Sequence, residues 1–171
     1  MECIILAGGL GTRLQETIGS LPKCMAPVNG EPFLHYLLEY LGKEGCTSII
    51  LSLGYKNEVI REWLSERDFA FKIRWVIEKD PLGTGGGIAL AMKEVTEADV
   101  IVMNGDTLFQ VPLTELMDFH LGQKAETTLA LKHLTNFDRY GTVSLTGDGY
   151  VKSFHEKQLS HSGEINGGVY V

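Results

Sequence analysis

The chain has 171 residues, of which 44% are apolar and 22% charged, and its formal net charge is −7. This length and balance predict one globular domain, residues 1–171, with a substantial core. The acidic balance argues against a protein that binds nucleic acid or an anionic membrane, because such proteins collect phosphates on a basic surface. Cys3, Cys24 and Cys46 lack paired spacing and indicate neither a disulfide framework nor a zinc site. With no signal segment and no apolar run near the roughly 18 residues of a membrane span, we expect a cytoplasmic protein.

The first predicted element is an apolar strand at residues 3–7 that stops in a glycine-rich turn, Gly8-Gly9-Leu10-Gly11-Thr12-Arg13. An apolar run without polar alternation is typical of a strand buried on both faces, as in a parallel sheet. The glycines let the backbone approach a ligand, and exposed N–H groups beside Arg13 would form an anion site. An ordinary surface turn is the competing interpretation.

Strands and helices then alternate. Prolines on both sides of Lys23 predict an extended loop there. We expect strands at 48–53, 72–77 and 99–103, helices with apolar stripes at 34–41, 59–64, 88–95 and 113–121, and a second glycine turn at 80–87. This order predicts an α/β fold, a three-layer, doubly wound, mostly parallel sheet with helices on both faces. Ligands bind beyond the carboxyl ends of such strands, where both glycine turns and Asp106 would lie.

The last third of the chain is richer in strands. Residues 127–134, 142–145 and 150–155 are strand-like, with a turn at 146–149, and predict a small antiparallel extension that could act as a lid. The chain stops at Val171 within an apolar strand, and we expect further residues to follow in the full protein.

Asp106 is a candidate metal ligand. It follows a buried strand, where a carboxylate is costly unless it is exposed at the strand end or bound to a metal. Magnesium suits this position, because it favours carboxylate and phosphate oxygens. Capping of the following turn is the alternative role.

Several motifs follow one another in the order and spacing of a known family. They are Leu6-Ala7-Gly8-Gly9-Leu10-Gly11-Thr12-Arg13, Pro22-Lys23, Glu78 before Pro81-Leu82-Gly83-Thr84-Gly85, Asn104-Gly105-Asp106, Arg139-Tyr140-Gly141-Thr142-Val143, Phe154-His155-Glu156-Lys157 and Asn166-Gly167-Gly168-Val169-Tyr170. In this combination the chain resembles the sugar-1-phosphate nucleotidyltransferases, or nucleotide-sugar pyrophosphorylases. Among them it is most similar to the heptose 1-phosphate guanylyltransferases. The resemblance implies their Rossmann-like fold.

The resemblance also implies a reaction in which a sugar 1-phosphate attacks the α-phosphate of a nucleoside triphosphate and pyrophosphate leaves. Arg13, Lys23 and Asp106 would be catalytic, with Asp106 holding Mg²⁺. Glu78 matches the position associated with the nucleobase, and its carboxylate could accept the N1–H and N2 hydrogens of guanine, which suggests GTP. The nucleotide would lie on Leu6, Ala7, Gly8, Gly9, Gly11, Thr12, Arg13, Glu78, Gly83 and Thr84.

On the sugar side, the resemblance implies a pocket for a heptose or hexose 1-phosphate made by Tyr140, Gly141, Glu156, Lys157 and Asn166. The chain departs from the family pattern at Cys24, where proline usually follows the motif lysine. The family's second metal-binding aspartate lies beyond the strand at 166–171, where this sequence has no residue.

Two other functions stay open. Without the second carboxylate, the chain could be a non-catalytic nucleotide-binding module. A nicotinamide-dependent oxidoreductase is disfavoured, because Leu14 and Ile88 stand where the dinucleotide fingerprint needs glycine. The sequence predicts neither a nucleic-acid nor a membrane partner, and it leaves a homo-oligomer open.

Overall fold

The computed structural model describes residues 1–9 and 19–171. Eight of the described strands form one sheet in the order β5-β4-β1-β6-β10-β8-β9, with β7 also paired to β10. The parallel half comprises β1 (Glu2–Ala7), β4 (Ser48–Leu53), β5 (Lys72–Ile77) and β6 (Ile101–Asn104). The antiparallel half comprises β7 (Leu129–Phe137), β8 (Thr142–Leu145), β9 (Val151–His155) and β10 (Ser160–Tyr170).

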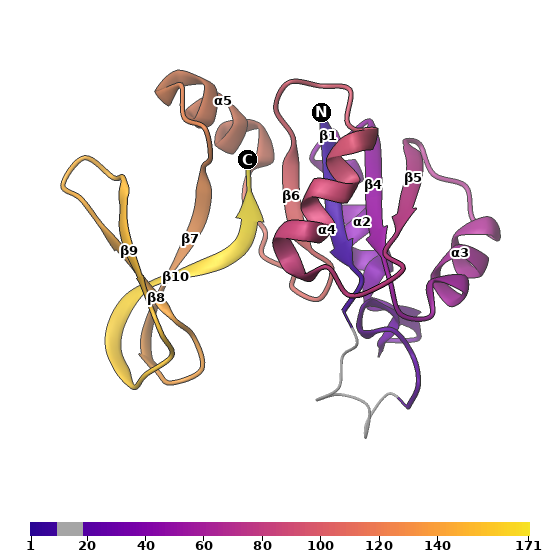
Figure 1. The fold of residues 1–171 in the computed structure, drawn as a ribbon, viewed down its shortest axis with the longest axis horizontal. Coiled ribbons are helices and arrows are strands. Elements are labelled where there is room, and N and C mark those ends of the chain that lie inside the picture. Colours follow the sequence, from indigo (N-terminus) through magenta and orange to yellow (C-terminus); the bar gives the residue numbers. More distant parts are fainter. Residues whose placement is uncertain (10–18) are drawn as a thin grey trace.

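The parallel half has a hydrophobic core on each face of the sheet. Successive side chains of β1 point to opposite faces and so contribute to the two cores in turn. Cys3 and Ile5 face a core made with α2 (Phe33–Lys43), α3 (Asn57–Ser65) and α5 (Leu113–Gln123). Ile4 faces the other core, with α4 (Gly83–Ala91). Figure 1 shows α4 and α2 on opposite faces of these strands. The predicted three-layer, doubly wound arrangement is confirmed.

The short elements before α2 hold the loop that carries Lys23. They are the 3₁₀ turn η2 (Lys23–Met25) and the two-stranded ribbon of β2 (Pro27–Val28) and β3 (Glu31–Pro32). Cys24 and Met25 are buried beneath this loop. Burial of these two side chains therefore fixes where the Lys23 side chain starts.

The predicted glycine turn at 80–87 is wrong in part, because residues 83–87 already belong to helix α4. Gly83 has φ +69° and begins the helix. The helix ends at Ala91 and passes into the 3₁₀ turn η3 (Met92–Glu94), so Val95 lies outside it. Leu121, expected on the buried stripe of α5, is 53% exposed. Within the described ranges, every helix is too short or too polar to span a membrane.

The antiparallel half is larger than the predicted hairpin. The β8–β9 hairpin is present, but β10 begins at Ser160 and pairs with β7 along most of its length. At its far end β10 pairs with β6, through Val169 opposite Met103. Figure 1 shows β10 curving from one half of the molecule to the other. One long strand therefore joins both halves into a single sheet.

Candidate functional site

The carboxyl ends of the parallel strands surround a cavity of about 400 Å³, which we call the first cavity. Its lining is Leu6, Ala7, Gly8, Gly9, Lys23, Cys24, Glu78, Pro81, Gly83, Thr84, Asn104, Gly105 and Asp106. Every residue predicted to contact the nucleotide lines it, as far as the described ranges go. Gly11, Thr12 and Arg13 lie outside the described residues.

Glycines at the strand ends let neighbouring backbones approach closely beside the first cavity. A β-carbon at Gly54 would lie 2.7 Å from the carbonyl oxygen of Gly8, and one at Gly105 would lie 2.7 Å from that of Leu6. The Gly105 N–H donates to the same Leu6 oxygen at 2.9 Å. Larger residues would separate the strand ends, so the glycines are needed for this close approach.

The Glu78 carboxylate is held at both of its oxygens. Oε1 accepts a hydrogen bond from the Ser52 hydroxyl at 2.9 Å, and Oε2 accepts one from the Leu82 N–H at 3.1 Å. β-carbons at Gly8 and Gly87 would lie 2.7 and 2.9 Å from Oε1. Glu78 is therefore confined to one orientation at the edge of the cavity.

Lys23 and Asp106 form an ion pair at the mouth of the first cavity. The side chains are 38% and 36% exposed, so both can reach a ligand in the cavity. The Thr107 hydroxyl donates to the other carboxylate oxygen of Asp106 at 3.2 Å. This arrangement places one cation and one anion next to each other at the point where the predicted triphosphate would lie.

A second cavity, of about 610 Å³, opens beside the antiparallel half. Its lining is Lys23, Arg139, Tyr140, Gly141, Thr142, Val143, Phe154, His155, Lys157, Ile165 and Asn166. Four of the five predicted sugar-phosphate residues are among them, and Glu156 is not. Lys23 lines both cavities.

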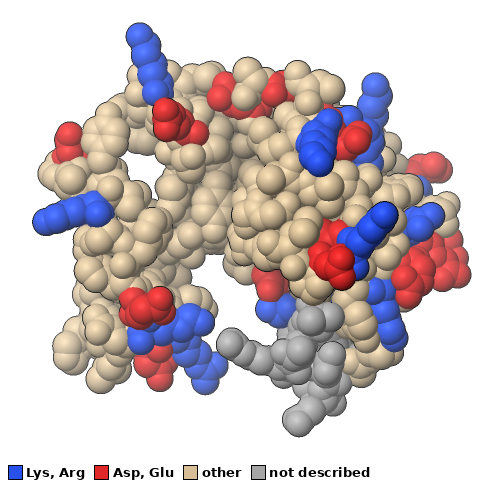
Figure 2. All heavy atoms as spheres, viewed as in Figure 1, with Lys and Arg blue, Asp and Glu red and all other residues tan. Residues whose placement is uncertain are grey.

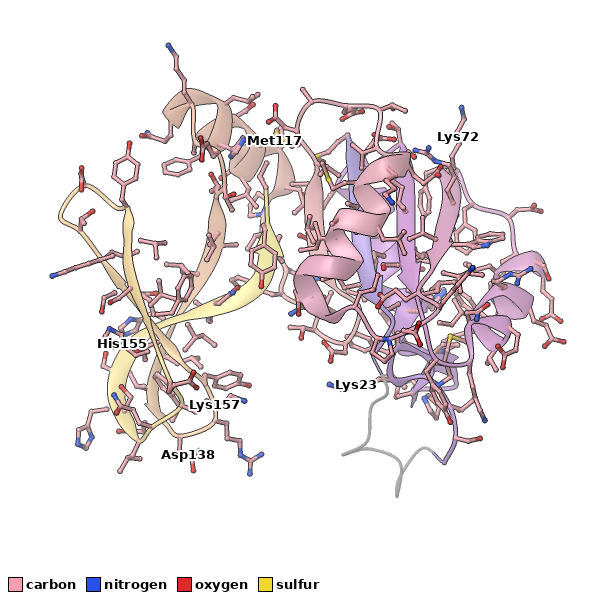
Figure 3. All side chains as sticks on the ribbon, viewed as in Figure 1. Lys23, Lys72, Met117, Asp138, His155 and Lys157 are labelled. Atoms are coloured by element: carbon pink, nitrogen blue, oxygen red, sulfur yellow. The ribbon has the colours of Figure 1, made fainter. Side chains whose placement is uncertain are left out.

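The space between the two halves is visible from outside. Figure 2 shows the surface hollowed between them. In Figure 3, Lys23 projects from the parallel half towards the antiparallel half, and Lys157 lies on the facing side. Two lysines from distant parts of the sequence therefore face the same cavity.

Close packing at glycines and hydrogen bonds of Asn166 position the residues of the second cavity. A β-carbon at Gly141 would lie 2.5 Å from the carbonyl oxygen of His155, so glycine keeps β8 and β9 together. Asn166 donates from Nδ2 to the Tyr170 hydroxyl at 2.9 Å and accepts from the Gly168 N–H at 2.8 Å. Gly167 packs directly beneath the Phe109 ring, where no β-carbon fits. These contacts fix the bend of β10 beside the cavity.

The sequence analysis assigned no role to Ser52, Arg139 or Cys24, which lie in or next to the two cavities. Ser52 is a polar residue that interrupts the apolar run of a buried strand, and that break in the pattern was its only signal. Arg139 stands in a quoted motif but was given no role, although it lines the second cavity. Cys24 lies under the first cavity, 2% exposed, and burial raises the pKa of its thiol to about 12, with Asp106 adding to the effect.

The described residues fit a divalent cation only if a bound nucleotide supplies part of its ligands. Within residues 1–9 and 19–171, no group of three or more His, Cys, Asp or Glu side chains could hold a metal ion. The half-exposed Asp106 carboxylate can supply one ligand. Magnesium typically takes one or two carboxylates and completes its shell with phosphate oxygens and water, so the donor set suits an ion that binds together with a nucleotide.

Comparison with known proteins agrees with this geometry. A family model described as nucleotidyl transferase matches residues 2–171. The chain is 49% identical, over its whole length and 74% of the relative, to D-glycero-alpha-D-manno-heptose 1-phosphate guanylyltransferase of Aneurinibacillus thermoaerophilus. It is 46% identical to the protein of the same name from Campylobacter jejuni, again over its whole length and 75% of that relative.

Among solved structures, HddC from Yersinia pseudotuberculosis complexed with GMP-PN superposes with a TM-score of 0.88 at 37% identity, covering 99% of this chain and 75% of that one. A putative glucose-1-phosphate thymidylyltransferase from Bacillus anthracis shares the fold, with a TM-score of 0.83 at 22% identity, over 99% of this chain and 70% of that one. The family match runs from β1 to β10 and so includes both cavities. The chain belongs to the nucleotidyl transferase family, as its motifs predict.

Proposed function

We propose that the chain transfers guanylate from GTP to a heptose 1-phosphate and releases pyrophosphate. The proposed acceptor is D-glycero-α-D-manno-heptose 1-phosphate, which the names of the two relatives give. The observation that carries this proposal is that Lys23 lines both cavities. A transfer between two phosphorylated substrates needs them side by side with a cation at the junction. The names and similarity of the two guanylyltransferase relatives support the choice of substrates.

The proposed reaction asks the protein for position and charge more than for covalent chemistry. A phosphate oxygen of the sugar 1-phosphate attacks the α-phosphorus of GTP. The bond from that phosphorus to the bridging oxygen breaks, and pyrophosphate leaves with the electron pair. Lys23 would neutralise charge at the α-phosphate, while Lys157 would hold the sugar phosphate in the facing cavity.

Asp106 would hold a magnesium ion together with phosphate oxygens. When bound, the ion would neutralise charge on the triphosphate. The neighbouring Lys23 ammonium keeps the Asp106 carboxylate at the mouth of the first cavity, and Thr107 restricts its rotation. Arg13, Gly11 and Thr12 are proposed partners of the triphosphate from the family motif alone.

Glu78 would select guanine, and Gly83 and Thr84 would line the base and ribose side of the first cavity. Tyr140, Gly141 and Asn166 would surround the sugar ring. Glu156 keeps its proposed role only if it turns towards the cavity when sugar binds. A cytoplasmic location is part of the proposal, supported by three buried, unpaired thiols.

The test is pyrophosphate release by the purified chain with magnesium, the heptose 1-phosphate and each of GTP, ATP, UTP and CTP. We expect turnover with GTP and little with the others. Preference for UTP would contradict the guanine assignment. GTP binding by calorimetry without any pyrophosphate would instead identify the alternative function, a nucleotide-binding module. The motivating observation is that the described residues hold no group of three or more side chains able to bind a metal ion, which leaves Asp106 as the one proposed metal ligand among them.

A further inference from the structure

We propose that Ser52 is a positioning residue that orients the Glu78 carboxylate and thereby sets the preference for guanine over adenine. This inference rests on the proposed function, because it concerns how Glu78 meets the base of GTP. Ser52 itself does not line the first cavity and touches no substrate; it acts through Glu78.

The Ser52 hydroxyl lies in the protein interior, where it requires hydrogen-bond partners. It is fully buried, next to the carboxyl end of β4. Burying a hydroxyl without a hydrogen-bond partner costs free energy, so the partners of Ser52 indicate its role. The hydroxyl oxygen lies 2.9 Å from Glu78 Oε1 and 3.3 Å from the carbonyl oxygen of Gly87. Having one proton, the hydroxyl is best placed to donate it to the nearer, charged acceptor.

The second anchor is the Leu82 N–H, which donates to Oε2 at 3.1 Å. A carboxylate has about four lone-pair positions, two on each oxygen. Among the contacts of residues 1–9 and 19–171, Ser52 and Leu82 use one position on each oxygen and leave one free on each. Two free acceptors on adjacent oxygens match two adjacent donors.

Guanine presents such a pair of donors at N1–H and N2–H, whereas adenine presents an acceptor at N1. A carboxylate held in this orientation would attract guanine and repel adenine, so selectivity would come from both effects. A carboxylate free to rotate would lose part of this discrimination.

Packing around Oε1 explains why the orientation depends on Ser52. Gly8 and Gly87 approach so closely that β-carbons would lie 2.7 and 2.9 Å from this oxygen. These glycines leave room for the carboxylate but offer no side chain to hold it. Among the contacts described, the Ser52 hydroxyl is the side-chain donor to Glu78.

The experiment compares Ser52→Ala with the unchanged chain in steady-state assays with GTP and with ATP. Loss of a hydrogen bond to a charged group should raise KM for GTP about tenfold, with kcat changed less. The ratio of kcat/KM for GTP over ATP should fall by about the same factor. Ser52→Thr keeps the hydroxyl and should restore most of the ratio. A role limited to folding would lower the melting temperature without moving this ratio.

Ser48→Ala is the matched control. Ser48 lies at the other end of the same strand, is 8% exposed, and its hydroxyl accepts from Arg74 at 3.2 Å. We expect this variant to leave KM for GTP and the GTP/ATP ratio unchanged. If Ser52→Ala does not fold, Ser52→Cys fills a similar volume with a weaker donor and should lower the ratio in the same direction.

A second pair of variants separates this inference from the proposed function. Ser52→Ala should add nothing to the effect of Glu78→Gln if the serine acts through the glutamate. A loss of the ratio in Glu78→Gln but not in Ser52→Ala would overturn the inference alone. No change in either variant would overturn both the guanine assignment and the inference. If the unchanged chain shows no turnover, GTP and ATP binding by calorimetry replaces kinetics, and equal GTP affinity in Ser52→Ala would reject the inference.

Discussion

At the scale of single residues, Lys23 is the side chain on which the proposed chemistry depends most. Lys23→Ala should lower kcat/KM by about 10²- to 10³-fold, since one charge-stabilising group is lost from the transition state. Its ion pair with Asp106 is more than one-third exposed on both sides, so we expect the melting temperature to stay nearly unchanged. Pyrophosphate assays and calorimetric unfolding measure both effects.

Lys43→Ala is the control for Lys23. Lys43 is also part of an exposed ion pair, with Glu39, and its side chain is 76% exposed on α2. This variant should keep full activity. Near-normal turnover in Lys23→Ala would exclude Lys23 from the reaction.

Cys24 should resist alkylation although it lies beside the first cavity. Burial and the nearby Asp106 raise the pKa of its thiol to about 12, so at pH 8 almost none of it is the reactive thiolate. Native protein treated with iodoacetamide should therefore leave Cys24 unmodified, while protein in guanidinium reacts within minutes to hours. Peptide mass spectrometry gives the result. Equal rates in both states would show that the loop opens freely.

Residues that stand in motifs could be predicted from the sequence, whereas Ser52 could not. Glu78 and Asp106 could be predicted to line the first cavity because each stands in a motif just after a strand, where parallel topology brings strand ends to one edge. Lys23 lies in the 3₁₀ turn η2 and could be predicted from its motif alone. Ser52 could not be assigned in that way. Its role depends on a hydrogen bond from β4 to the end of β5, and this contact exists only after the strands have paired.

At the scale of elements, Glu2 of β1 links this strand to β5 and to the loop after η3. Glu2 is 3% exposed, pairs with Arg74 of β5 at 2.7 Å, and accepts from the N–H groups of Thr96 and Glu97 at 2.6 and 3.0 Å. We expect Glu2→Gln to lower the free energy of unfolding by about 2 kcal/mol, because hydrogen bonds to a charged group are lost. Urea denaturation measures this, with the exposed Glu39→Gln on α2 as a nearly neutral control.

The stabilisation by Glu2 should depend on pH in a defined direction. Burial raises the pKa of this carboxyl, but the hydrogen bonds from Thr96, Glu97 and Ser48 outweigh it and leave the pKa below the ordinary value of 4.5. The contribution is therefore present above pH 4.5 and is lost as the pH falls through the lowered pKa. The difference in stability between the unchanged chain and Glu2→Gln should shrink on acidification, and a constant difference would contradict this explanation.

Helix α4 shows why one element was mispredicted. Four glycines near its start read as a turn, because glycine costs about 1 kcal/mol relative to alanine inside a helix. In the structure Gly87 packs against Glu78 and Ser52, where a β-carbon would collide. Packing against the strand ends therefore overrides local propensity. The strands β4 and β5 were predicted at their observed bounds, Ser48–Leu53 and Lys72–Ile77.

At the scale of the whole molecule, the first cavity is lined by the parallel half, whereas all described lining residues of the second cavity except Lys23 belong to the antiparallel half. Variants in the antiparallel half should therefore affect the second cavity alone. Gly141→Ala would push β8 from the His155 carbonyl, displacing the hairpin that carries Lys157. We expect KM for the sugar 1-phosphate to rise about tenfold, because small displacements of positioning groups are costly, while KM for GTP changes little. Varying each substrate in turn measures this.

Gly147→Ala is the companion variant, in the turn of the same hairpin, where a β-carbon meets nothing within 4 Å. It should leave both KM values unchanged. A rise in KM for GTP in Gly141→Ala would mean that the halves move together.

The joining of the halves was the least predictable part of the fold. The sequence predicts an antiparallel addition at residues 127–155, but β10 is almost twice as long as the expected final strand because it extends back to Ser160. Its pairing with β6 on one side and β7 on the other depends on the bend at Gly167 and Gly168. That bend follows from the fit of Gly167 beneath Phe109, which no local pattern encodes.

The position of β10 also orders the folding reaction in time. Val169 and Tyr170 pair with Met103 and Val102, far earlier in the chain, whereas β1, β4, β5 and β6 are complete before β10 is synthesised. Closing a long loop costs chain entropy and slows folding. A nascent chain should therefore assemble its nucleotide cavity first and gain the cavity for the acceptor substrate only once β10 has docked.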